Sequence, residues 1–154
     1  MNLDARATDR VIAPGETIEK TLRFTREDIL AFARLSHDTN PLHVDTRAAQ
    51  RARFGEIIAS GQQSAGILMG MLATHYSRDT DGVKREMLCL NMNFAFKGPV
   101  FADQEVTLRW KVASSQWNSK LQGVLAHLDG SVSVVEDKPL VVGRGTILVK
   151  EIVE

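Results

Sequence analysis

The sequence predicts an α+β protein in which a curved antiparallel sheet wraps around one long, buried helix. Residues 60–77 carry apolar side chains on nearly every side of a helical projection, which is typical of a helix covered on most of its surface. From residue 86 onward, four segments alternate between apolar and polar residues and are separated by turn residues, as antiparallel strands are. The helices precede this run of strands, and that order favours α+β.

The first part of the chain predicts an arm, a short strand and a helix. Residues 1–15 are polar and of mixed charge, and we expect them to form an N-terminal arm. Residues 16–24 alternate between apolar and polar side chains, which predicts a strand. Thr25 caps the helix that follows through a variant of the capping box. Asn40 and Pro41 end this helix, because proline disfavours helical backbone at the residue before it.

A second short helix, the long helix and four strands follow. Asp45 caps the second helix, residues 46–53, and the long helix is the apolar segment 60–77. The strands are expected at residues 87–97, 105–112, 121–135 and 140–152. We expect residues 136–139 to form the hairpin turn between the last two strands, and Gly130 to form a β-bulge.

The composition is that of an ordinary soluble protein of 154 residues, and we expect residues 16–154 to form one domain. Lys and Arg number 19, as do Asp and Glu, so the basic surplus of nucleic-acid-binding proteins is lacking. No apolar stretch is long enough to cross a bilayer, and the N-terminus lacks the apolar segment of a secretory signal. The single cysteine, Cys89, is expected to be a buried apolar residue. These features favour a cytoplasmic protein without membrane or nucleic-acid partners.

A carboxylate and an imidazole, Asp38 and His43, lie five residues apart on either side of Asn40 and Pro41. Because proline restricts the backbone of both residues, we expect a rigid loop that presents the two side chains together. Such a pair suits general acid–base catalysis. Residues 57–61 then open the long helix, whose free backbone N–H groups stabilise a developing negative charge. Acid, base and anion site together predict an enzyme that acts on a carbonyl compound.

Three parts of the chain carry a more specific pattern. They are residues 24–29 with 35–45, which include Asp-Thr-Asn-Pro-Leu-His; residues 54–61, which end in Ile-Ile-Ala-Ser-Gly; and residues 93–101, Asn-Phe-Ala-Phe-Lys-Gly-Pro-Val-Phe. This pattern resembles the MaoC-like enoyl-CoA hydratases and dehydratases, also called R-specific hydratases. The resemblance extends over residues 16–150. It implies a hot dog fold, in which a curved antiparallel sheet wraps a long central helix, and a homodimer or higher homo-oligomer.

The resemblance also implies roles for individual residues. Asp38 and His43 fall on the family's acid–base pair, which holds one water against a trans-2-enoyl thioester and yields an (R)-3-hydroxyacyl thioester. Asp38 is expected to accept a proton from the water and His43 to supply one, although the reverse assignment can also be argued. Asn40 is expected to orient this pair or the water, and the backbone N–H of Gly61 to hold the thioester oxygen. Substrate contacts are expected from Pro41, Ile58, Ala59 and Ser60. No cofactor is implied beyond coenzyme A as a part of the substrate.

The chain departs from the family pattern at two positions. Relatives commonly have His-Gly where this chain has Ser60 and Gly61. The backbone donor is therefore kept while the neighbouring side chain differs, which bears on substrate preference more than on the reaction. His37 stands where a small residue is usual, and we expect it to lie near the site.

Two other functions remain open on the sequence: a hot dog acyl-CoA thioesterase and a non-catalytic module that binds acyl thioesters. Many thioesterases of this fold place an acidic residue on or beside the central helix, and residues 60–77 contain no Asp or Glu. The presence of both Asp38 and His43 argues against the binding module. A metal site at His43 and Asp45 lacks a third ligand.

Two other histidines and four basic residues have simpler structural interpretations. His75 and His127 are expected to be packed or solvated. Isolated surface cations are usually only solvated, although four of them are candidates for contact with the phosphates of coenzyme A: Arg51, Arg53, Lys84 and Arg85.

Overall fold

A five-stranded antiparallel sheet and one long helix make up most of residues 8–154, the part of the chain that the computed structural model describes. The strands are β1 (Thr17–Arg23), β2 (Arg85–Phe96), β3 (Glu105–Asn118), β4 (Gly123–Val135) and β5 (Lys138–Glu151). The helices are α2 (Arg26–Ser36), α3 (Pro41–Val44), α4 (Thr46–Arg51) and α5 (Gly61–His75). Residues 1–7 of the expected arm lie outside the described residues. Within residues 8–154 no helix is long and apolar enough to span a membrane.

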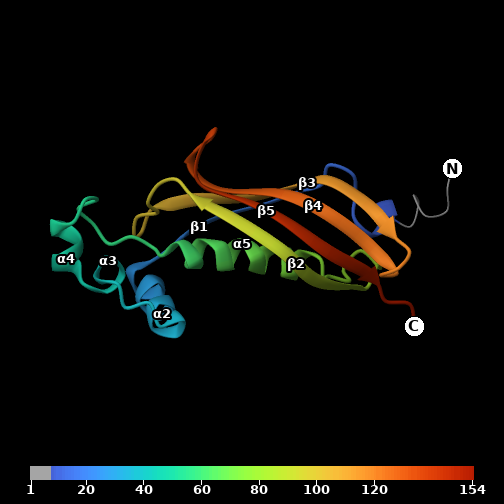
Figure 1. Ribbon diagram of the computed structural model, residues 1–154, viewed down its shortest axis with the longest axis horizontal. Helices are drawn as coiled ribbons and strands as arrows, with labels where there is room; N and C mark the ends of the chain where they lie inside the picture. The colour runs from blue at the N-terminus through green and yellow to red at the C-terminus, as the bar shows by residue number, and fades with distance from the viewer. Residues whose placement is uncertain (1–7) are drawn as a thin grey trace.

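The sheet curves along α5, as the sequence predicts (Figure 1). Its strand order is β1-β3-β4-β5-β2, and every neighbouring pair is antiparallel, so that β1 and β2 form the two edges. Helices α2, α3 and α4 gather at the end of the molecule where α5 begins (Figure 1). The predicted α+β class and the helix wrapped by the sheet are both confirmed. The N-terminus of α5 therefore meets the short helices at one end of the sheet.

Trp110 fixes α5 on the sheet. Its side chain is fully buried, and its indole Nε1 donates a hydrogen bond to the backbone carbonyl of Leu68 in α5, at 2.8 Å. The ring lies against Gly130, where a Cβ would approach it to 2.6 Å. Gly130 pairs in regular register with Trp110 on β3 and with Gly143 on β5, so the predicted bulge at Gly130 is wrong. The glycine is required by the space that the indole occupies.

The irregularities of the sheet lie elsewhere. The β3–β4 register shifts between Val112 and Ser114, and β3 continues through this shift to Asn118, beyond the predicted end of the strand. A second irregularity lies at the end of β4, next to the hairpin turn. That turn is confirmed between β4 and β5, and Asp137 adopts the left-handed conformation there, with φ 65°.

The segment after α2 differs from the prediction. The capping box at the start of α2 is confirmed, but the helix ends at Ser36 because His37 adopts a left-handed conformation with φ 59° and caps it. His37 is exposed. Asn40 and Pro41 instead begin α3, a single helical turn where the sequence suggested only a loop. The side chain of Asn40 caps this turn, and Pro41 at its first position loses no hydrogen bond there.

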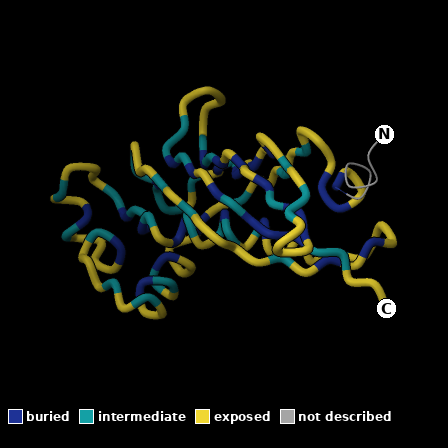
Figure 2. Tube along the Cα trace, turned by 45° about the vertical axis from the view of Figure 1, so that its right-hand side comes forward, coloured by how far each residue is buried: buried dark blue, intermediate teal, exposed yellow. Residues whose placement is uncertain are grey.

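Two predictions of burial are wrong for the single chain. The long helix α5 buries one face, which carries Leu68 and Leu72, while its opposite face is partly exposed. Cys89 is exposed on the edge strand β2. Both results have one cause, since the sheet covers α5 from one side only and β2 has a neighbouring strand on one side only. Figure 2 shows buried positions in the interior and exposed positions along the loops.

A buried polar cluster closes the C-terminal end of α5. Glu16 receives the phenol O–H of Tyr76 at 3.2 Å and lies 2.6 Å from Nε2 of His75. The side chain of Arg85 is 1% exposed and lies 2.7 Å from Asp81. Hydrogen bonds from Arg85 hold the pKa of the Asp81 carboxyl well below its usual range. Arg85 is thus buried and fully engaged, and the suggestion that it contacts coenzyme A is wrong.

We expect Tyr76 to make the fold less stable at alkaline pH. Burial, and then the charge of Glu16, raise the pKa of Tyr76 well above its ordinary value of 10.0. Folding therefore favours the neutral phenol, whose stabilising contribution is complete below pH 10 and is lost as the pH rises beyond it. Tyr76 is the one tyrosine of the chain, so Tyr76→Phe removes this titration entirely.

The measurement is the free energy of unfolding in urea at neutral pH and above pH 10. At neutral pH, Tyr76→Phe should cost about 1 kcal/mol for the lost hydrogen bond. From neutral to alkaline pH, its stability should fall less than that of the parent protein. Equal falls in the two proteins would contradict this account of Tyr76.

Candidate active site

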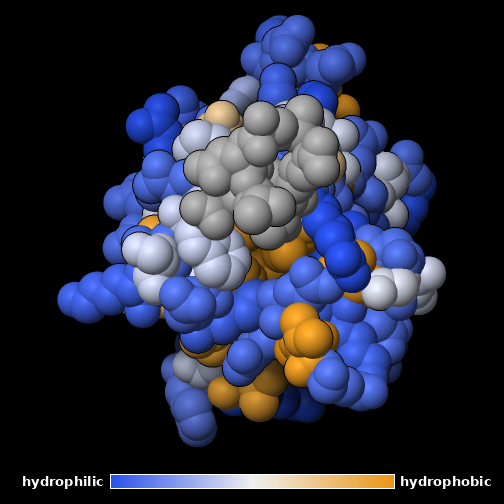
Figure 3. Space-filling model, turned by 90° about the vertical axis from the view of Figure 1, so that its right-hand side faces the viewer, coloured by the Kyte–Doolittle hydropathy of each residue, from blue (hydrophilic) through white to orange (hydrophobic). Residues whose placement is uncertain are grey.

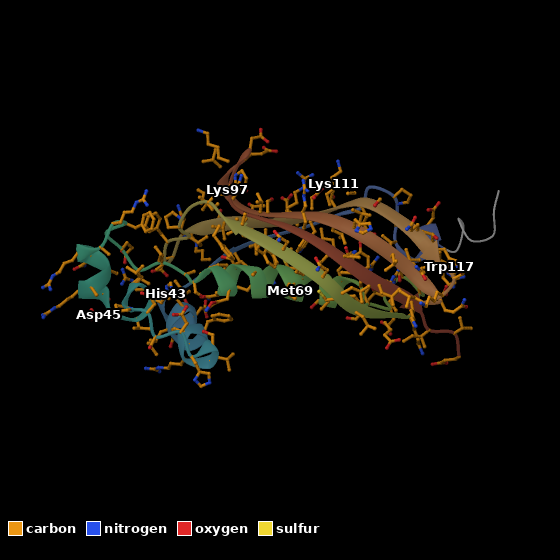
Figure 4. The ribbon with its side chains drawn as sticks, in the orientation of Figure 1. His43, Asp45, Met69, Lys97, Lys111 and Trp117 are labelled. Atoms are coloured by element: carbon orange, nitrogen blue, oxygen red, sulfur yellow. The ribbon has the colours of Figure 1, made fainter. Side chains whose placement is uncertain are left out.

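His43 and Gly61 line one cavity of about 540 Å³ at the end of the molecule where α5 begins. Figure 4 places His43 beside α2 and the first turn of α5. Most of the remaining lining comes from the segment that joins α4 to α5, the first turn of α5, and the end of β2 with the loop after it. Asn40 and Leu42 beside His43, and Val141 on β5, also line it. Asp38 is not one of the described lining residues, but its carboxylate contacts His43, which is. The structure thus brings together the acid, the base and the helix N-terminus that the sequence singled out.

His43 is held in one orientation by a backbone carbonyl. Its Nδ1 lies 2.7 Å from the carbonyl oxygen of Ile58, to which it donates a hydrogen bond. The ring is 8% exposed and belongs to α3. Because Nδ1 keeps its proton for the carbonyl, Nε2 is the ring nitrogen that gains or loses a proton. Nε2 lies 3.6 Å from Oδ2 of Asp38.

Asp38 is held by two donors from different parts of the chain. The backbone N–H of Asn40 donates to its Oδ1 at 3.2 Å, and the side-chain amide of Gln62 donates to its Oδ2 at 3.0 Å. Gln62 was missed in the sequence. Gln62 directly follows Gly61, so it lies in the first turn of the helix that the sequence predicts. The sequence does not show, however, which of the two consecutive glutamines faces the carboxylate.

Asn40 lines the cavity, and its side chain also shapes the loop. Its Oδ1 accepts the backbone N–H of Leu42 at 3.1 Å and so caps α3, while its own N–H binds Asp38. Pro41 starts α3 and is absent from the described residues that line the cavity. Both residues therefore shape the segment that carries Asp38 and His43.

Ser60 and Gly61 form the start of α5. Ser60 is the N-cap: its Oγ accepts the backbone N–H of Gln63 at 3.2 Å, and the residue is 5% exposed. Gly61 is the first helical residue, so its N–H precedes the first intrahelical hydrogen bond. A Cβ at Gly61 would lie 2.8 Å from the ring of Phe96, which lines the same cavity. Any larger residue at this position must therefore displace the Phe96 ring.

The two residues before Ser60 tie the site to the rest of the fold. Ile58 forms an isolated bridge with Phe101, and its carbonyl orients His43. The backbone N–H of Ala59 donates to the carbonyl of Val100 at 2.8 Å. Both side chains line the cavity. This short crossing fixes the start of α5 relative to the loop after β2.

Positive charge also reaches the cavity. Arg53 and Lys97 are among its lining residues, and the guanidinium of Arg53 lies 5.3 Å from the centre of the Phe54 ring. Lys84, another suggested contact for phosphates, pairs with Glu154 at the C-terminus of the chain.

No cluster of three metal-ligating side chains occurs within residues 8–154. Asp45, which the sequence analysis paired with His43 as a weak candidate, uses its carboxylate to cap α4 through the backbone N–H groups of Arg47 and Ala48. Figure 4 shows Asp45 beside α4, farther from α5 than His43.

Comparison with solved structures shows the same fold. An (R)-hydratase from Aeromonas caviae, described as involved in PHA biosynthesis, superposes with a TM-score of 0.74 at 26% identity and covers 87% of this chain and 94% of its own. A MaoC-like dehydratase from Rhodospirillum rubrum gives a TM-score of 0.75 at 19% identity, over 96% of this chain and 99% of its own. The hot dog arrangement of helix and sheet is therefore confirmed.

Sequence comparison agrees. The mitochondrial 3-hydroxyacyl-acyl-carrier-protein dehydratase FERN of Solanum lycopersicum is 24% identical over 149 residues, which cover 96% of this chain and 83% of that protein. An (R)-specific enoyl-CoA hydratase of Aeromonas caviae is 31% identical over 100 residues, which cover 65% of this chain and 70% of that protein. The family model of the MaoC like domain matches residues 10–129. The chain, in which Asp38 and His43 lie near the first turn of the central helix, belongs to the MaoC-like domain family.

Proposed function

We propose that the chain is a hydro-lyase that adds water to a trans-2-enoyl thioester to give the (R)-3-hydroxyacyl thioester, and that catalyses the reverse dehydration at the same site. The observation that carries this proposal is the facing pair, Oδ2 of Asp38 and Nε2 of His43, 3.6 Å apart beside the free N–H of Gly61. The names of the relatives, hydratase and dehydratase, describe the two directions of such a reaction.

The pair moves two protons in one cycle. Asp38 accepts a proton from the water as the water oxygen attacks C3 of the enoyl group. The imidazolium form of His43 gives its Nε2 proton to C2, and the two new bonds form on the same face because the two groups lie next to each other, 3.6 Å apart. Asp38 then returns its proton to Nε2 across the short gap between them, which restores the starting state.

The start of α5 stabilises the charge that this reaction builds. As water adds to C3, negative charge grows on the thioester oxygen. The N–H of Gly61 precedes the first intrahelical hydrogen bond and is free to donate to that oxygen. A preset donor of this kind contributes about 3 kcal/mol to transition-state stabilisation. Holding that oxygen leaves C2 and C3 free to face Asp38 and His43.

The thioester carrier is proposed to be coenzyme A or an acyl carrier protein, with no separate cofactor. Arg53 and Lys97 line the cavity and give it positive charge, which favours the approach of a phosphate-bearing carrier. The thioesterase alternative lacks support, because α5 carries no acidic side chain. The hydroxyl of Ser60 is engaged as a helix cap and has no base beside it among the contacts described above.

The first test is a panel of trans-2-enoyl-CoA thioesters of different chain length, followed through the absorbance of the conjugated double bond. We expect the parent protein to consume at least one of them. Asp38→Asn and His43→Ala should each lower kcat by about 10²-fold or more, because each removes half of the proton transfer.

The matched control for this test is His127→Ala. His127 is exposed on β4, where its Nδ1 contacts Thr146, and its loss should leave turnover unchanged. Folding of each variant is checked by circular dichroism. Near-parent activity in both folded site variants would rule out the proposed pair.

The second test concerns the start of α5. Ser60→Ala should keep turnover within about tenfold, or 1.4 kcal/mol, because Ser60 is a cap and not a nucleophile. Gly61→Val should abolish turnover, since its side chain must displace the Phe96 ring and obstruct the thioester oxygen. Gly70→Val is the control within the same helix, because a Cβ at Gly70 meets no atom within 4 Å.

Mass spectrometry completes this second test. An acyl group trapped on Ser60 would overturn the hydro-lyase proposal in favour of a hydrolase. Parent-like turnover in Gly61→Val would exclude the backbone donor.

The third test concerns a homodimer, which we propose forms along the edge strand β2. Leu88, Leu90 and Phe96 are 50%, 49% and 55% exposed on this strand, and apolar residues on an unpaired edge favour strand pairing with another copy. The end of the molecule seen in Figure 3 is mainly hydrophilic, with separate hydrophobic patches. A two-fold pairing of β2 with its own copy would bury these apolar residues against each other.

Sedimentation at micromolar concentration should give at least twice the mass of the 17.0 kDa chain. Leu88→Lys combined with Leu90→Lys should shift the protein toward a monomer, because like charges then oppose each other across the pairing. Leu35→Lys, on the exposed side of α2, should leave the mass unchanged. A parent protein that sediments as a monomer would exclude this interface.

A further inference from the structure

We propose that Gln62 is a positioning residue that holds the Asp38 carboxylate in its working orientation; this rests on the proposed function. The side-chain Nε2 of Gln62 donates to Oδ2 of Asp38 at 3.0 Å. The same oxygen faces Nε2 of His43 at 3.6 Å. Gln62 therefore acts on the very atom that takes the proton from water.

The two donors on Asp38 leave its carboxylate little freedom. The N–H of Asn40 binds Oδ1, and the amide of Gln62 binds Oδ2. A carboxylate with one donor can turn about its terminal bond, whereas donors on both oxygens, from different elements, oppose that rotation. Oδ2 is thereby kept toward His43. Without Gln62, only the backbone N–H within the Asp38 loop would remain.

The contact also joins the two halves of the site. Asp38 belongs to the segment after α2, while Gln62 is the second residue of α5 and directly follows Gly61. The hydrogen bond thus sets the distance between the carboxylate that accepts from water and the N–H that holds the thioester oxygen. Both must fit one substrate at once, and a displacement of about 1 Å between reacting groups costs on the order of 10²-fold in rate.

The chemistry of the side chain fits this task. An ionised carboxylate only accepts hydrogen bonds, so its partner must be a donor, and the amide supplies N–H without adding charge. A neutral donor steadies the carboxylate without forming an ion pair that would compete with His43. Gln63 cannot take over, since it is 3% exposed and lies toward α2 and β1, outside the cavity.

The experiment compares Gln62→Leu with Gln116→Leu, a matched change at an exposed glutamine on β3. Gln62→Leu should lower kcat by about three- to tenfold, the effect of one exposed hydrogen bond, with KM changed by less than about twofold. Gln62→Glu should lower kcat further, because a second carboxylate then faces Asp38. Gln116→Leu should match the parent protein.

A double-mutant cycle tests whether Gln62 acts through Asp38. In the Asp38→Asn background, Gln62→Leu should cause no further loss of residual activity, because the group that Gln62 positions has been removed. Equal fold-losses in both backgrounds would overturn the proposal. A raised KM with unchanged kcat would do so as well, since it would make Gln62 a substrate contact.

A spectroscopic readout keeps this proposal separate from the proposed function. The side-chain amide of Gln62, assigned in a ¹⁵N–¹H spectrum by its loss in Gln62→Leu, should shift in Asp38→Asn, and the amide of Gln116 should not. If the parent protein hydrates no enoyl thioester but this shift appears, the proposed reaction fails and the contact stands. If the protein is active and the amide of Gln62 does not respond to Asp38→Asn, the positioning role fails alone.

Discussion

The placement of α5 against the sheet is the constraint on which the rest of the molecule depends. The indole of Trp110 reaches from the middle of β3 to the carbonyl of Leu68, and the neighbouring strand β4 accommodates the ring by carrying Gly130. A buried N–H that lost this acceptor would cost about 1–3 kcal/mol, so the helix has one favoured position along the sheet. The first turn of α5 then stands at a fixed point at the end of the sheet.

The site is built outward from that point. Three hydrogen bonds attach the neighbouring segments to it: His43 to the carbonyl of Ile58, the N–H of Ala59 to Val100, and the side chain of Gln62 to Asp38. Main-chain groups cannot rotate away as side chains do, so the contacts of Ile58 and Ala59 fix the orientation of His43 and the start of α5. The position of Asp38 relative to α5 depends instead on a side chain, that of Gln62.

Much of the fold and of the candidate site could be predicted from the sequence, because these parts depend on local patterns of residues. The pattern around Asp38, Pro41 and His43 and the apolar segment of α5 depend on local spacing, and they predicted that Asp38 and His43 lie together near the start of the long helix. The single turn α3 was missed because proline is compatible with a loop as well as with the first position of a helix. Gly130 was misread as a bulge because only the three-dimensional fold places the Trp110 ring over it. The contact of Gln62 with Asp38 could not be predicted, because the two residues lie 24 positions apart and only the fold brings them together.

Phe96 serves two surfaces at once. It is more than half exposed on the free edge of the sheet, and its ring also lies against Gly61 in the cavity. A chain that pairs with β2 would cover the exposed side of Phe96, while the same ring forms part of the cavity wall. A substitution at Phe96 therefore changes the sheet edge and the cavity together, and neither surface can be altered there without the other.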